Sequence, residues 1–250
     1  MATDALVAVA GLAAGTINTV VGSGTLITFP VLLALGVPPV TANVTNTIGL
    51  VPGSFSGAWS YRRELAGQRG TLIRLGSASL LGGIAGALLL LVLPAGVFKD
   101  VVPALIIIAL GLVVLQPWLA GRMSRDQDVA DRPGRSVVLW ILVLLTGVYG
   151  GYFGAAQGVL LIAIMGILLD SDLQRVNGIK NVLTGLVNGV AGVIFIALAK
   201  PDWTYVAIIA VGSALGGQLG GMIGRRLKPM LLRAVIIVVG IAALIKFLTG

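Results

Sequence analysis

The chain has 250 residues, of which 57% are hydrophobic and 10% are charged, and its mean hydropathy is +1.05. This composition excludes a soluble domain of this size and indicates an integral, polytopic membrane protein in a lipid bilayer. The net charge of +8 does not indicate a nucleic-acid partner, because most of the 17 cations lie in three short connectors, as in positive-inside loops.

Apolar segments recur along the whole chain, and two of them are short. The segments lie at 5–21, 25–36, 41–60, 75–93, 101–119, 136–150, 157–169, 178–199, 204–224 and 230–248. Crossing the hydrocarbon core takes about 20 helical residues, so 25–36 and 157–169 are too short. Each follows a glycine-rich break. We therefore predict two helical hairpins, 5–36 and 136–169, that enter the membrane and return; two short, tilted spans are the alternative for each.

The two halves of the sequence resemble each other at a spacing of 134 positions. Gly24 matches Gly158, and Asn43 matches Asn177. The pattern of serine, leucine and glycine at 79–86 also returns at 213–220. Several matches at one spacing predict an internal duplication, which is common in secondary transporters.

The cation-rich connectors predict the topology. Those at 61–74, 120–135 and 225–229 are expected to be cytoplasmic, which places both termini outside the cell membrane. Each half then has one hairpin and three spans, an odd number, so the halves are predicted to be inverted repeats. The predicted regions are a first transmembrane repeat at 1–119, a cytoplasmic linker at 120–135 and a second transmembrane repeat at 136–250.

Small residues follow one helix face in each half, at 82–86 and 216–221. Such faces let helices approach closely. We expect internal packing between the repeats, and the alternatives are a homodimer interface or a ligand contact.

Acidic residues are confined to predicted connectors and segment ends. Their absence from span centres argues against a carboxylate proton relay, a carboxylate-bound sodium site and a cationic substrate. The chain has no cysteine and no histidine, and no motif for a nucleophile with its base, a nucleotide or a metal is present. The sequence therefore predicts neither an enzyme nor a cofactor or metal site.

The two breaks are instead surrounded by neutral donors. Half-helices that begin near Ser23 and Ala156 would direct free N–H groups at the breaks, and helix N-termini attract anions. A small anion is the expected substrate. The candidate substrate-binding residues are Asn18, Ser23, Gly24, Thr25, Asn46, Tyr152, Gln157, Lys180 and Asn181.

Three of these candidates have a structural alternative. Lys180 either contacts the anion or snorkels to the cytoplasmic interface, and snorkelling is the favoured interpretation. Asn46 and Asn181 either line the cavity or form hydrogen bonds between helices.

The sequence also resembles a known family. The resemblance rests on residues 11–15, 22–30, 33–38 and 41–46 in the first half, and on 147–154 and 177–181 in the second. These stretches are similar to the TauE/SafE family of sulfite and organosulfonate exporters. Two departures are Thr25, where the family often has a further glycine, and the 154–158 stretch, which has fewer glycines.

This resemblance implies a secondary transporter that exports small sulfur-containing anions such as sulfite or organosulfonates. Together with the residues, it predicts alternating access, with substrate bound between the two hairpin tips. A small-anion or carboxylate channel or transporter is the alternative, and a membrane scaffold whose glycines serve only packing is a further one.

Overall fold

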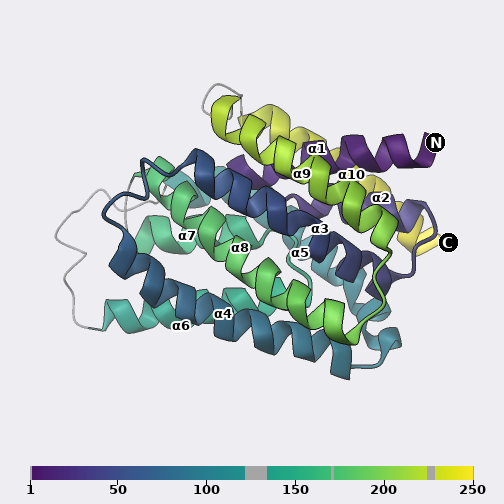
Figure 1. The fold of residues 1–250 in the computed structure, drawn as a ribbon, viewed down its shortest axis with the longest axis horizontal. Coiled ribbons are helices and arrows are strands. Elements are labelled where there is room, and N and C mark those ends of the chain that lie inside the picture. The colour runs from purple at the N-terminus through teal and green to yellow at the C-terminus, as the bar shows by residue number, and fades with distance from the viewer. Residues whose placement is uncertain (1, 122–133, 170–171, 224–228, 250) are drawn as a thin grey trace.

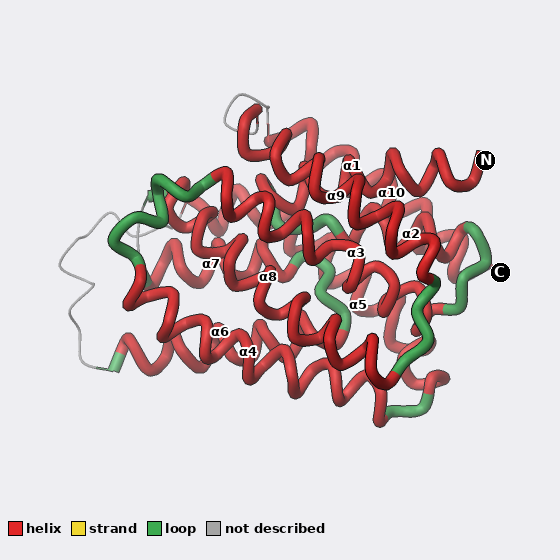
Figure 2. Tube along the Cα trace, in the orientation of Figure 1, coloured by secondary structure: helices red, strands yellow, loops and turns green. Residues whose placement is uncertain are grey.

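The computed structural model describes residues 2–121, 134–169, 172–223 and 229–249. These ranges contain ten α-helices joined by loops and turns, and no strand, which confirms the predicted all-helical class (Figure 2). The helices are α1 (Ala2–Val20), α2 (Thr25–Ala34), α3 (Pro39–Ser60), α4 (Arg69–Val92), α5 (Ala95–Gly121), α6 (Arg135–Tyr152), α7 (Gln157–Leu168), α8 (Leu173–Leu198), α9 (Trp203–Ile223) and α10 (Pro229–Thr249). Most of the predicted linker at 120–135 and of the cation cluster at 225–229 lies outside the described residues.

Each predicted apolar segment corresponds to one helix, but several helices begin earlier than hydropathy indicates. The clearest case is α8, whose first polar turn precedes the predicted start at 178. The carboxylate of Asp172 accepts hydrogen bonds from the backbone N–H groups of Gln174 at 2.9 Å and Arg175 at 3.3 Å. This N-cap starts the helix within a polar stretch that an apolar window leaves out.

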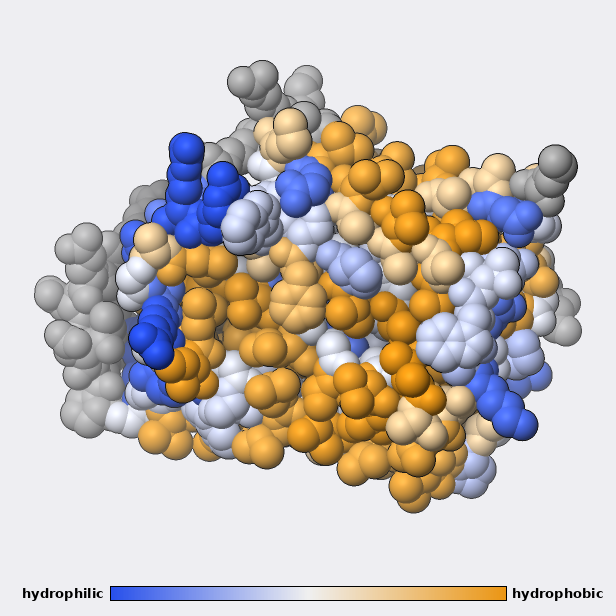
Figure 3. All heavy atoms as spheres, viewed as in Figure 1, coloured by the Kyte–Doolittle hydropathy of each residue, from blue (hydrophilic) through white to orange (hydrophobic). Residues whose placement is uncertain are grey.

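Six described helices are long and apolar enough to cross a membrane: α1, α4, α5, α6, α8 and α9. Helices α2 and α7 have only 10 and 12 residues, as predicted for the short arms of the hairpins. In the view of Figure 3, apolar side chains cover the middle of the molecule and hydrophilic ones gather toward its two ends. The chain is therefore a multi-pass membrane protein.

The path of the chain fits the hairpin interpretation. Helix α1 begins and α10 ends at the same end of the molecule, on the right of Figure 1. The connection from α2 to α3 also lies at this end, so the α1–α2 pair enters the bundle and returns. The loop at 61–68 lies at the opposite end.

Helix packing crosses between the two halves of the chain. Helix α1 packs along α9, and α6 packs along α4; α3 packs against α9, and α8 against α4. The short helix α2 contacts α10, and its counterpart α7 contacts α5. Each contact has a counterpart made by the helices five places away in the chain. The α1–α9 pair corresponds to α6–α4, α3–α9 corresponds to α8–α4, and α2–α10 corresponds to α7–α5.

The glycines of α4 and α9 make this packing close. A Cβ added to Gly82 would lie 2.8 Å from the backbone nitrogen of Val148 on α6, and one added to Gly220 would lie 2.7 Å from the carbonyl oxygen of Thr16 on α1. Both small-residue faces are thus occupied by helices of the same chain. This confirms internal packing as their role.

We predict that Gly82→Ala destabilises the protein, because the new methyl group would collide with the α6 backbone. Overpacking of this kind costs about 1–3 kcal/mol. The matched control is Gly111→Ala in α5, where a Cβ meets nothing within 4 Å; this change should be neutral or slightly stabilising, since alanine favours helix. Thermal unfolding in detergent measures both. Equal melting temperatures for the two variants would contradict the close α4–α6 contact.

Candidate functional site

The two glycine-rich breaks meet inside the molecule. The first separates α1 from α2 and the second separates α6 from α7, and the backbone N–H of Gly158 donates to the carbonyl oxygen of Gly22 at 3.0 Å. A Cβ on either glycine would collide with the Cα of the other. Two segments far apart in the sequence are therefore held in direct backbone contact.

Positive φ angles at both breaks redirect the chain. Gly22 has a φ of 87° and Gly154 a φ of 77°, a region that glycine adopts readily. Ala156 has a φ of 58°, which is uncommon for a residue with a side chain. The smaller number of glycines in this break therefore does not prevent the turn, because Ala156 adopts the left-handed conformation itself.

Lys180 of α8 binds the end of α1. Its Nζ donates to the backbone oxygens of Asn18 at 2.7 Å and Thr19 at 2.9 Å. The last carbonyls of a helix lack intrahelical partners and carry partial negative charge, so a cation stabilises them. The side chain is 0% exposed. The snorkelling interpretation is therefore wrong, since the ammonium group lies inside the protein.

Asn181 and Asn43 also bind the ends of broken helices. The amide of Asn181 donates to Thr19 O at 3.3 Å, beside Lys180. The amide of Asn43 on α3 donates to the backbone oxygen of Tyr152 at 2.9 Å, at the end of α6. Each broken helix is thus capped by a helix of the other half. The sequence signal for Asn43 was its match with Asn177, but this did not reveal the capping role.

Other candidates join the first hairpin to α3. The amide of Asn46 donates to Thr25 Oγ1 at 3.2 Å, and Thr28 Oγ1 donates to Asn46 Oδ1. The Asn18 amide donates to Ser54 Oγ at 3.3 Å. Asn46 and Asn181 therefore form the interhelical hydrogen bonds that were the alternative to lining a cavity.

Several buried polar atoms near the breaks have no protein partner. They include Ser23 Oγ, Gln157 Nε2, Thr19 Oγ1 and Asn181 Oδ1. Ser23 and Gln157 are 0% and 1% exposed. A buried polar group without a hydrogen bond is costly, above all in a membrane, and these atoms have unused hydrogen-bonding capacity.

Gly24 and Tyr152 contribute differently from the other candidates. Gly24 permits close packing, because a Cβ there would lie 2.6 Å from Ala14 O. The Tyr152 ring packs edge-on against Phe98, with centroids 5.6 Å apart. Tyr152 contributes its backbone carbonyl, which accepts the hydrogen bond from Asn43, and not its ring.

Charged groups around the breaks are of one sign in the described part of the chain. The described acidic residues lie in the first turn of α1, in the second turn of α5, in a loop or directly before helices. Within those same ranges, no three histidine, cysteine or acidic side chains are grouped to hold a metal ion. The polar centre thus combines one buried lysine amine with neutral donors and acceptors.

An all-helical membrane protein with two broken helices that meet at a polar centre has an architecture found among membrane transporters. A family model described as "Sulfite exporter TauE/SafE" matches residues 7–247. The chain therefore belongs to the TauE/SafE family.

Curated relatives are similar over most of their length. The chain is 27% identical over 240 residues to "Probable membrane transporter protein ORF9" of Sinorhizobium sp, covering 96% of this chain and 90% of the relative. It is 26% identical to "Probable membrane transporter protein YfcA" of Escherichia coli strain K12, covering 94% of this chain and 86% of that relative. A "Probable membrane transporter protein" of Haemophilus influenzae is 28% identical, covering 83% and 80%. No solved structure matches.

We predict that Lys180→Met lowers the stability of the protein. Methionine retains an apolar chain of similar length but removes the donors to Asn18 O and Thr19 O, and an unsatisfied buried acceptor costs about 1–3 kcal/mol. The control is Lys200→Met at an exposed site beyond the end of α8. The melting temperatures of the two variants, measured by thermal unfolding in detergent, compare their stabilities. A Lys180→Met protein as stable as the parent would show that α1 does not need this cap.

Proposed function

We propose that this protein is a secondary transporter that exports small sulfur-containing anions, such as sulfite or organosulfonates. The main observation that supports this proposal is the contact between Gly22 and Gly158, which brings two helix breaks together in a buried polar centre. Substrate binds between the two hairpin tips, and transport follows alternating access. The family description supports sulfite, whereas the printed names of the relatives say only that they are membrane transporters.

The groups around the breaks favour an anion. Lys180 supplies a positive charge, and Ser23 and Gln157 supply a hydroxyl and an amide without protein partners. Helices α2 and α7 both begin at the breaks, so their N-termini direct N–H groups and the positive ends of their dipoles toward the tips. In this proposal Asn18, Thr25, Asn46 and Asn181 position these elements through the hydrogen bonds already described.

The exchange of helix contacts between halves supports two inverted repeats, at 1–119 and 136–250, with the linker at 120–135. We propose that the helices packed on α9 rock against the helices packed on α4 and that this motion separates the Gly22–Gly158 contact. The charge distribution supports cytoplasmic cation-rich connectors, both termini outside, and a location in the cell membrane.

Counterflow of radiolabelled sulfite in liposomes tests the proposal. The parent protein should show saturable counterflow that excess sulfoacetate suppresses, because both anions compete for one site. Flux without counterflow would indicate a channel, and suppression by lactate but not by sulfonates would indicate a carboxylate transporter. No flux of any anion would contradict the proposed substrate class.

The same assay tests the site through Gln157→Ala. This change removes a buried amide donor and should reduce counterflow about tenfold, in line with a hydrogen bond to a charged group of about 1.5–3 kcal/mol. Gln68→Ala, in the loop before α4, is the matched control and should leave flux unchanged. Equal flux in both variants would remove Gln157 from the site.

A further inference from the structure

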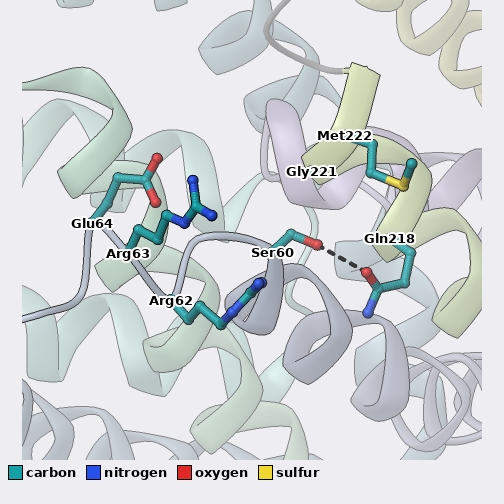
Figure 4. A pocket seen from close by; sticks show the side chains of 7 residues that line it. All are labelled: Ser60, Arg62, Arg63, Glu64, Gln218, Gly221 and Met222. Carbon is teal, nitrogen blue, oxygen red and sulfur yellow. Dashed lines mark hydrogen bonds between the residues drawn. The ribbon is translucent and has the colours of Figure 1, made fainter.

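A polar pocket lies at the end of the molecule opposite the termini, where α3 ends beside the last turns of α9 (Figure 4). Its volume is about 260 Å³ and it shares no residue with the breaks. The pocket is lined by Ser60, Arg62, Arg63, Glu64, Gln218, Gly221 and Met222.

Arg62 is held in place at this pocket. Its Nη1 donates to the backbone oxygen of Trp59 at 3.2 Å, and its guanidinium carbon lies 5.3 Å from the centre of the Trp59 ring. A guanidinium has five N–H donors, so these contacts fix the group and leave donors for a ligand. A pre-positioned donor loses less freedom when it binds.

The other polar groups extend the same surface. Figure 4 shows Arg62 extending from the loop after α3 toward Ser60, and Arg63 lying beside Glu64. Ser60 Oγ donates to Gln218 Oε1 at 3.3 Å and joins the end of α3 to α9. Two guanidinium groups and one carboxylate, that of Glu64, line the pocket. The lining therefore carries an excess of positive charge and suits an anionic oxygen group such as phosphate.

Exposed apolar side chains adjoin these charges. Trp59 on α3 is 64% exposed and Met222 on α9 is 71% exposed. Both lie in the last turn of their helices. A ligand with a charged head and an apolar tail can contact both the guanidinium groups and the exposed apolar side chains. Free phosphate can contact only the guanidinium groups.

We propose that this pocket binds the phosphate headgroup of an anionic phospholipid, with Arg62 and Arg63 on the headgroup and the acyl chains along Trp59 and Met222. Basic pockets between transmembrane helices are a known form of lipid headgroup site. The predicted cytoplasmic location of this end agrees, since that leaflet carries anionic lipid.

The test measures lipid binding to the purified full chain in neutral detergent by native mass spectrometry, without transport substrate. Phosphatidylglycerol should bind at one saturable site and more tightly than phosphatidylcholine. Arg62→Gln and Arg63→Gln should each weaken phosphatidylglycerol binding about fivefold. The control Arg69→Gln, in the same stretch but outside the pocket lining, should change it less than twofold.

Two further measurements distinguish binding of a phospholipid from binding of a free phosphate compound. Glycerol 3-phosphate should compete weakly, and Met222→Gln should weaken phosphatidylglycerol binding while leaving that of glycerol 3-phosphate unchanged. Equal binding of the two lipids, an equal loss in Arg69→Gln, or glycerol 3-phosphate competing as well as the lipid would each overturn the proposal. Arg62, Arg63 and Met222 are exposed, so their replacement should leave the fold intact.

Discussion

The structure depends on one constraint: a helix that ends inside a membrane must find partners for its last carbonyl groups. Water is not available there, and an unsatisfied backbone group costs several kcal/mol. Helices α1 and α6 both end in the interior, where Lys180 binds the end of α1 and Asn43 binds the end of α6. Each cap comes from the other half of the chain. The halves are therefore interdependent, and the breaks are stable only where they meet.

Glycine makes this arrangement possible, because the backbones approach too closely for any side chain. Gly22 and Gly158 touch at the centre, and Gly82 and Gly220 let α4 and α9 lie against their partners. Close packing in these pairs keeps the broken helices α1 and α6 fixed to the longer helices α9 and α4. In the proposed cycle, movement is then concentrated at the contact between the tips.

Periodicity and hydropathy in the sequence predicted the ten segments, the two short arms and the breaks, because each depends on neighbouring residues. The contacts of Lys180 could not be predicted in the same way. Its partners lie more than 160 positions away, and a lysine near a segment end usually snorkels. The left-handed Ala156 was equally hidden, since alanine carries no local signal for that conformation. The pocket that Arg62 and Arg63 line together with residues of α9 likewise depends on the three-dimensional arrangement.

The central claim is that the polar centre between the breaks opens to each side of the membrane in turn. The chain has no cysteine, so Ser23→Cys provides a single thiol at the first break without further changes. Its labelling by a membrane-impermeant maleimide should be measured from each side of sealed vesicles, with and without sulfoacetate, a sulfonate that does not react with the reagent. Alternating access predicts labelling from both sides and protection by sulfoacetate. Labelling from one side only, unaffected by any anion, would contradict it.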